Sequence, residues 1–151
     1  MRITESIKNI LTEQINNYRL LLELLQRERE YLVDLNAIEV ENLSKEKDTI
    51  VLKLRLLEEE RIRLINKFSA DKGIKEKVSL QMLYELTEDE DFHTMRLQLI
   101  SLMQSIQELS AFNTILIDRS LSFVRHSMGF LESCGLFIDQ KNTGIILSRE
   151  I

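Results

Sequence analysis

Apolar residues from Ile3 to Leu35 recur with a seven-residue period, in two adjacent rows along the chain. Two such rows are typical of a helix in a coiled coil, because they return to the same side of the helix every second turn. The pattern therefore predicts one long helix over this stretch. Its rows are Leu11, Tyr18, Leu25 and Leu32, and beside them Ile7, Gln14, Leu21, Glu28 and Leu35.

A second helix is predicted from Asn36 to about Phe68. Asn36 followed by Glu39 has the spacing of a capping residue and its reciprocal glutamate, so the chain should turn here and start a new helix. The seven-residue period then continues in two further rows. They are Val40, Lys47, Leu54, Arg61 and Phe68, and beside them Leu43, Ile50, Leu57 and Leu64.

An antiparallel hairpin of these two helices has one register in which every layer is matched. Apolar residues then face apolar residues along both rows. The same register sets Gln14 opposite Arg61 and Glu28 opposite Lys47. Because a polar group left against hydrocarbon costs free energy, this matching specifies the register.

A third long helix is predicted to start at a capping box formed by Thr87 and Glu90, and to continue to about Cys134. Before it, residues 69–78 lose the period and contain a glycine, which indicates a connection, and Ser79 has the character of a cap for a short helix. The first half of the long helix presents one apolar stripe for packing. It consists of Phe92, Met95, Leu99, Leu102, Ile106 and Leu109.

The stretch Phe112–Leu131 holds more apolar residues than one buried stripe needs. Its central row turns small and polar while the flanking rows become apolar, which indicates that the core-facing stripe rotates around the helix. We expect Leu116, Phe123 and Phe130 to face the hairpin. A partner helix would then cover the residues about 100° away, with Ser120 small enough for close approach. These residues are Ile117, Leu121, Val124 and Met128.

The same apolar excess has a second explanation, in which the helix is sandwiched between others in a homodimer or a larger bundle. The protein would then be a homodimeric coiled-coil structural or adaptor protein, with the surface buried against a second copy. The pattern alone does not separate the two explanations.

Gly135 is a helix stop, and the residues after it have no reliable period. We therefore expect a helical domain over residues 1–134 and a flexible tail over residues 135–151. The expected fold is all-α. It is an antiparallel helical hairpin plus a long third helix, a three-helix coiled-coil bundle, with a mobile C-terminal tail.

The composition agrees with this fold and excludes several kinds of partner. The chain of 151 residues has no proline and four glycines, too few for strands joined by turns. Its net charge of −5 argues against nucleic acid, which requires a basic surface. No apolar run reaches the roughly 20 residues of a membrane span, and the start of the chain lacks the apolar core of a signal peptide. We expect a cytoplasmic protein with no membrane insertion.

No arrangement of residues predicts catalysis, a cofactor or a metal site. His93 and His126 lie far apart on one helix, so they cannot meet in a single site. His126 and Cys134 are two turns apart, about 12 Å of helical rise, which is too far to share a zinc ion. There is no phosphate-binding glycine loop. We expect a protein that is not an enzyme and carries no cofactor.

Three segments of the chain resemble one known family. They are Lys45–Lys47 leading into IVLKLRLLEEER, then VSLQML, then FNTILIDRSLSFVRHSMGFL. Together they look like the flagellar export chaperones of the FlgN type, over nearly the whole chain. The most specific part is an N-xx-L-I-xx-S-L arrangement, formed by Asn113, Leu116, Ile117, Ser120 and Leu121.

This resemblance implies a cytoplasmic chaperone of the flagellar type III secretion system. Such proteins hold the hook-filament junction proteins FlgK and FlgL unassembled and deliver them to the export apparatus. A tyrosine in the family's C-terminal segment is linked to docking there, and the nearest position here is Phe137, which lacks the hydroxyl. The implied client surface is Asn113, Leu116, Ile117, Ser120, Leu121, Phe123 and Val124.

Overall fold

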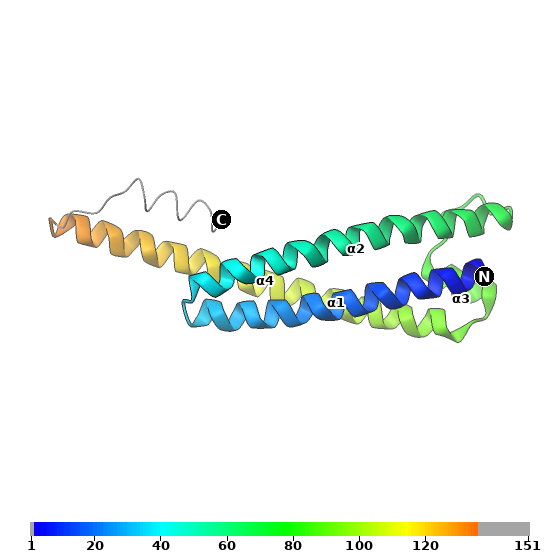
Figure 1. Cartoon of the computed structure of the whole chain (residues 1–151), viewed down its shortest axis with the longest axis horizontal. Coiled ribbons are helices and arrows are strands. Elements are labelled where there is room, and N and C mark those ends of the chain that lie inside the picture. The colour runs from blue at the N-terminus through cyan, green and yellow to red at the C-terminus, as the bar shows by residue number, and fades with distance from the viewer. Residues whose placement is uncertain (1, 136–151) are drawn as a thin grey trace.

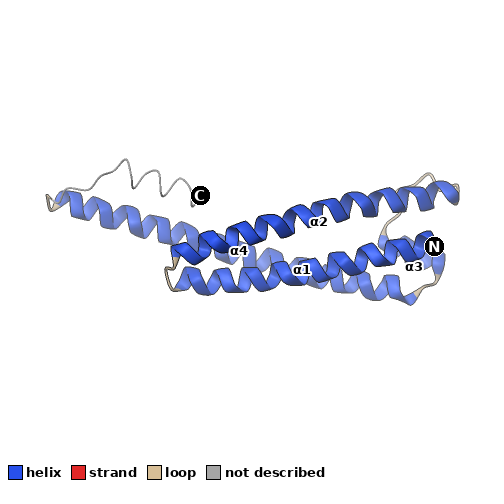
Figure 2. Cartoon of the chain, in the orientation of Figure 1, coloured by secondary structure: helices blue, strands red, loops and turns tan. Residues whose placement is uncertain are grey.

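The computed structural model describes residues 2–135, which form four helices joined by short connections (Figure 1 and Figure 2). The helices are α1 (Ile3–Val33), α2 (Ala37–Asp71), α3 (Leu80–Thr87) and α4 (Glu90–Ser133). Residues 2–135 contain no strand, so the predicted all-α fold of a hairpin plus a long further helix is confirmed. Apart from Gly135, the predicted tail lies outside the described residues, as does Phe137.

Helix α1 is the centre of an elongated bundle, because it packs extensively against both α2 and α4. Helix α2 runs antiparallel to it. Helix α4 runs parallel to it, since Lys8 near the start of α1 contacts Asp89 at the start of α4, and Glu28 near the end of α1 contacts Asn113. The short helix α3 packs on α4 at the end of the bundle that holds the N-terminus (Figure 1).

The hairpin has the register that the sequence predicts. Lys47 Nζ donates a hydrogen bond to the Glu28 carboxylate, as that register requires. At the second polar layer Glu58 stands between the two predicted partners. Gln14 Nε2 donates to Glu58 Oε2 at 2.8 Å, and Arg61 donates to the other oxygen of the same carboxylate. Both polar layers of the seam are thus joined across the hairpin by hydrogen bonds, although Gln14 Oε1 and Arg61 Nε are buried without a partner among the described residues.

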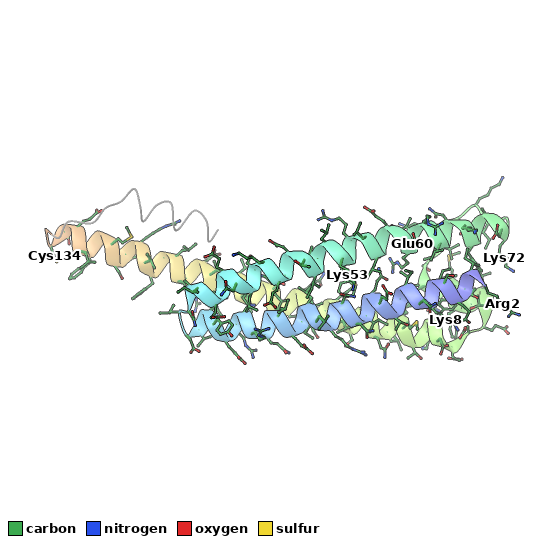
Figure 3. All side chains as sticks on the ribbon, viewed as in Figure 1. Arg2, Lys8, Lys53, Glu60, Lys72 and Cys134 are labelled. Atoms are coloured by element: carbon green, nitrogen blue, oxygen red, sulfur yellow. The ribbon has the colours of Figure 1, made fainter. Side chains whose placement is uncertain are left out.

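The core consists of two clusters along α1. The cluster beside α3 takes residues from all four helices, and α3 contributes Leu83, which is fully buried. The second cluster lies further along α1, around Leu21, Leu25 and Leu54, and Ile106 and Leu109 of α4 pack against it. Both clusters lie where α4 packs beside α1, away from the distal end of α4, which Cys134 marks in Figure 3.

Two helix ends differ from the prediction. Helix α2 continues past Phe68 and ends at Asp71. Two residues later Gly73 has a left-handed φ of 67°, and Ile74 N donates to the Ser69 carbonyl at 2.9 Å. The helix therefore continues until a residue that adopts this conformation without steric cost.

The cap of α4 is Asp89, so the predicted capping box at Thr87 is wrong. Thr87 is the last residue of α3, and its hydroxyl donates to the Leu83 carbonyl. Asp89 Oδ1 accepts instead from Asp91 N at 3.0 Å. A carboxylate at this position is also stabilised by the positive end of the helix dipole.

Lys8 joins the start of α1 to the start of α4. Its Nζ donates to Asp89 Oδ2 at 2.9 Å and to Asp91 Oδ2 at 3.3 Å, and lies 3.1 Å from Glu5 Oε1. The hydrogen bond to Asp89 is the largest of the effects that raise the pKa of Lys8. The same hydrogen bond lowers the pKa of Asp89, and the Asp91 backbone N–H lowers it further.

We expect Lys8→Met to lower the melting temperature at neutral pH, because Asp89 and Asp91 lose their shared cation. Since the pKa of Asp89 is lowered in the folded state, its stabilisation is complete above the unfolded value of about 4 and is lost as pH falls below it. The difference in melting temperature between the wild type and Lys8→Met should therefore shrink in acid. Thermal unfolding followed by circular dichroism across pH checks this, with Lys45→Met as the exposed control. A difference that stays constant down to pH ~3 would contradict the pairing.

Candidate functional site

Helix α4 continues well past the end of the hairpin. Asn113 lies level with Glu28 through their hydrogen bond, and α1 ends only five residues after Glu28, at Val33. Helix α4 continues to Ser133. Figure 1 shows the distal part of α4 projecting beyond the hairpin. At a rise of 1.5 Å per residue, this part is roughly 20 Å long.

A buried polar cluster marks the place where the projecting part begins. We call it the Glu28 node, and it consists of Glu28, Lys47 and Asn113. Asn113 Nδ2 donates to Glu28 Oε1 and to the Leu25 carbonyl, both at 2.9 Å, while Lys47 donates to Glu28 Oε2. Glu28 is 3% exposed and Asn113 1%. Both carboxylate oxygens are hydrogen-bonded and one is ion-paired, which is the condition for burying a charge.

Past the node, α4 and the end of the hairpin enclose a groove of about 420 Å³, which we call the tip groove. Helix α4 lines it with Ile117, Ser120, Leu121, Phe123 and Val124. The hairpin lines the other side mainly with Tyr31, Leu32, Leu35, Ala37 and Val40. Glu28 and Lys47 also line it. The groove is thus mostly apolar, with charged groups where it adjoins the Glu28 node.

The turn of the hairpin contributes an apolar tip that the sequence analysis missed. Leu35 adopts a left-handed φ of 55°, and the next residue, Asn36, donates its N–H to the Tyr31 carbonyl at 2.9 Å. Val33, Leu35 and Ile38 are 64%, 67% and 74% exposed. Turns usually carry polar residues or glycine. Apolar residues on both sides of the predicted cap at Asn36 were the available signal.

The structure brings five of the predicted client-surface residues together in the tip groove, namely Ile117, Ser120, Leu121, Phe123 and Val124. Leu116 and Met128 lie partly buried on the same helix and do not line the groove. Asn113 is different, because it is buried and its amide is bonded to α1. The prediction that Asn113 is part of the client surface is therefore wrong, and Asn113 belongs to the Glu28 node.

The predicted orientation of the distal helix is also wrong. Phe123 and Phe130, which were expected to face the hairpin, are 65% and 67% exposed. The buried stripe does not rotate, because Glu28 offers Asn113 a partner inside the bundle. Ile117 and Val124 lie on nearly the same side of the helix as Asn113 and therefore face the hairpin end, while Phe123 and Phe130 lie about 80–100° around the helix.

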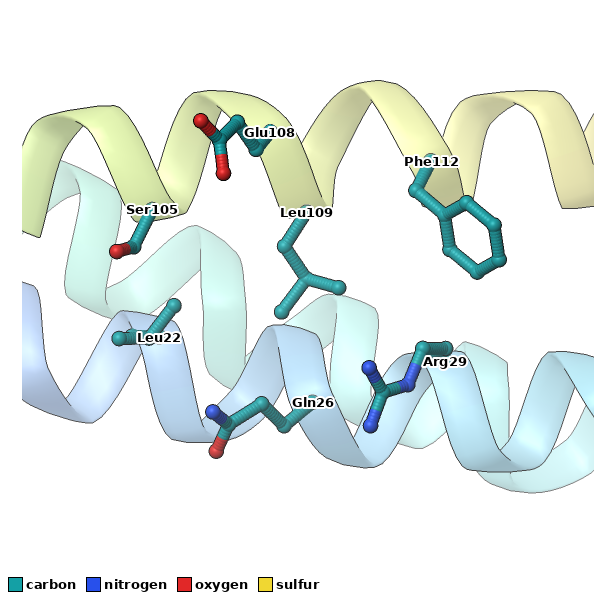
Figure 4. A pocket seen from close by; sticks show the side chains of 7 residues that line it. All are labelled: Leu22, Gln26, Arg29, Ser105, Glu108, Leu109 and Phe112. Carbon is teal, nitrogen blue, oxygen red and sulfur yellow. The ribbon is translucent and has the colours of Figure 1, made fainter.

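A second hollow of about 390 Å³ lies between α1 and α4, nearer the middle of the bundle. Figure 4 shows Ser105, Glu108, Leu109 and Phe112 of α4 opposite Leu22, Gln26 and Arg29 of α1. Its lining is mixed in polarity, and none of the predicted client-surface residues belongs to it. The tip groove is therefore the better candidate site.

None of the helices in residues 2–135 contains an apolar stretch of the length that a membrane span requires. The same residues contain no group of three or more His, Cys, Asp or Glu side chains placed to hold a metal ion.

Comparison with known families decides what kind of protein has this groove. A family model described as FlgN protein matches residues 1–134, which is most of the chain. The chain belongs to the FlgN family. No curated protein and no solved structure matches it significantly. FlgN is a family of flagellar export chaperones and not of enzymes, and the matched range contains both the Glu28 node and the tip groove of this FlgN family member.

We expect Asn113→Ala to lower the free energy of unfolding of this FlgN family member by about 2–3 kcal/mol, because a buried carboxylate oxygen loses its donor. Urea denaturation of the wild type and the variant measures the difference. Thr114→Ala, at an exposed position of the same helix, is the control and should change stability by less than about 0.5 kcal/mol. Equal effects of the two substitutions would show that the Glu28 node does not stabilise the fold.

Proposed function

We propose that the protein is a cytoplasmic chaperone of flagellar type III export that masks the helical ends of the hook-filament junction proteins FlgK and FlgL. Family membership supports the chaperone role. The identity of the clients is the part that we add. The single observation that supports a helical client is the tip groove, an apolar surface that no described part of the chain covers.

The tip groove has the form expected of a site for an amphipathic helix. From Ile117 to Val124 it follows two turns of α4, about 10 Å of rise, and the hairpin end forms its opposite wall. An amphipathic helix buries its apolar face by lying in such a groove. A filament protein whose ends later associate needs that face covered before assembly, and covering it by helix capture requires no nucleotide.

The competing proposal is a homodimeric coiled-coil adaptor. The observation that favours it is the exposed row of Phe123 and Phe130, which continues along α4 beyond the hairpin. A second copy of the chain could cover this row and the groove together. Sedimentation of the free protein separates the proposals. An obligate adaptor dimer should remain a dimer on dilution, whereas a client-free chaperone needs no second copy and should remain folded as a monomer.

Docking on the export apparatus through Phe137 stays a prediction. A phenylalanine can supply the apolar contact of the family tyrosine, though not its hydrogen bond.

The decisive experiment replaces both Ile117 and Val124 by Asp. Since both side chains line an open groove, the free energy of unfolding should change by less than about 1 kcal/mol, and capture of FlgK or FlgL should weaken at least tenfold. Circular dichroism and a pull-down with purified client measure the two effects. The matched control is Ile115→Asp with Ser122→Asp, which has the same spacing at exposed positions outside the groove and should retain binding.

Two outcomes contradict the proposal. Loss of the fold would mean that Ile117 and Val124 belong to a core, where two unpaired charges cost several kcal/mol. If both the fold and client binding are retained, the client binds outside the tip groove.

Leu35 offers an independent test from the hairpin side of the groove. Leu35→Gly should leave stability unchanged or raise it by up to about 1 kcal/mol, because the left-handed backbone conformation suits glycine. Client affinity should nevertheless fall, since the wall of the groove loses an apolar side chain. Chemical denaturation and a binding titration on one sample follow both quantities. An unchanged affinity would exclude the hairpin tip from the client site.

A further inference from the structure

The tip groove is mostly apolar, with a minority of polar and charged lining residues. Where it adjoins the Glu28 node, Glu28 and Lys47 line it, and we call these two residues the polar floor. The side chain of Glu28 is 4% exposed and that of Lys47 is 24% exposed. The buried Glu28 carboxylate is held by Asn113 and Lys47, so the floor is fixed in place by the Glu28 node.

The floor has unused hydrogen-bond donors. A lysine ammonium carries three N–H groups, and within residues 2–135 the side chain of Lys47 has one recorded partner, Glu28. An apolar helix seated over the floor would take the remaining donors out of water without replacing their partners. Such an unmade hydrogen bond weakens binding. An acceptor on the ligand restores the lost bond.

The charges around the floor restrict which acceptor fits. Glu28 already neutralises Lys47, and Glu41, also a lining residue, adds a negative charge. A carboxylate on the ligand would therefore meet net negative charge, while an ammonium has no acceptor atom for the remaining donors of Lys47. An uncharged amide avoids both conflicts. Its oxygen can accept from Lys47, while its NH₂ group can donate to hydroxyls such as that of Ser44, which also lines the groove.

We propose that the tip groove selects amphipathic helices that carry one Gln or Asn among their apolar residues, and that this amide accepts a hydrogen bond from Lys47. The inference rests on the proposed function, in which the groove receives a client helix. It adds a rule for which helices bind and in which register. A single buried amide fixes the register of coiled coils in the same way, because every shifted alignment leaves it unpaired.

The test uses synthetic amphipathic peptides of about 28 residues, four heptads, which is long enough to form a stable helix. The peptides are identical except at one central apolar position, which is Leu, Gln, Glu or Lys. Fluorescence anisotropy measures their binding to the full-length protein. We expect the Gln peptide to bind about tenfold more tightly than the Glu and Lys peptides and several-fold more tightly than the Leu peptide.

The matching variant is Glu28→Gln with Lys47→Met, which removes both charges of the floor and keeps a side-chain oxygen for Asn113. In this variant the order should reverse, with the Leu peptide bound more tightly than the Gln peptide. Lys45→Met, an exposed neighbour, should keep the wild-type order. Circular dichroism confirms that each variant is folded. A reversal of preference is not expected from a residue that only supports the fold.

The outcomes distinguish this inference from the proposed function. Equal affinity of the Gln and Leu peptides for the wild type, with binding still abolished by Ile117→Asp and Val124→Asp, would overturn the amide rule and leave the client groove intact. Affinities that the Ile117 and Val124 substitutions do not change would overturn both. A free protein that is a dimer, dissociated by those substitutions, would assign the groove to a second copy and also overturn the rule.

Discussion

Glu28 lies inside a seam of apolar residues, and its charge is stable there because two other helices donate hydrogen bonds to it. Lys47 supplies the counter-charge from α2, and Asn113 supplies an amide from α4. Breaking such a pair by removing one partner is far more costly than never having made it. The carboxylate therefore fixes the register of the hairpin and the height of α4 against α1 at the same place.

This one constraint also divides α4 into two parts with different surroundings. Before Asn113 the helix packs in the bundle through residues such as Phe92 and Leu99, which are buried. After it the helix passes the hairpin end, and apolar side chains such as Phe123 remain exposed. The open surface thus begins just past the hydrogen bonds that join Asn113 to α1.

Most of the fold follows from periodicity, and the candidate site follows only in part. The seven-residue rows predicted both helices of the hairpin, and the matching of Glu28 with Lys47 predicted its register, because both depend on spacing within the chain. The place of Asn113 could not be read in the same way. Its burial depends on a carboxylate that is distant in sequence, and a polar residue on an apolar helix is ordinarily exposed. The wrong orientation of Phe123 and Phe130 followed from the misplacement of Asn113. The apolar tip around Leu35 was missed for a different reason, which is that turns are expected to be polar.

The projection of α4 beyond the hairpin has a mechanical consequence. If the proposed client helix lies along this arm, tension applied from the free end would load its contacts one turn after another rather than all at once. Separation by peeling needs far less force than separation by sliding the two helices past each other. A client helix bound as proposed would therefore dissociate more readily when pulled from the open end of the arm than when pulled toward the bundle.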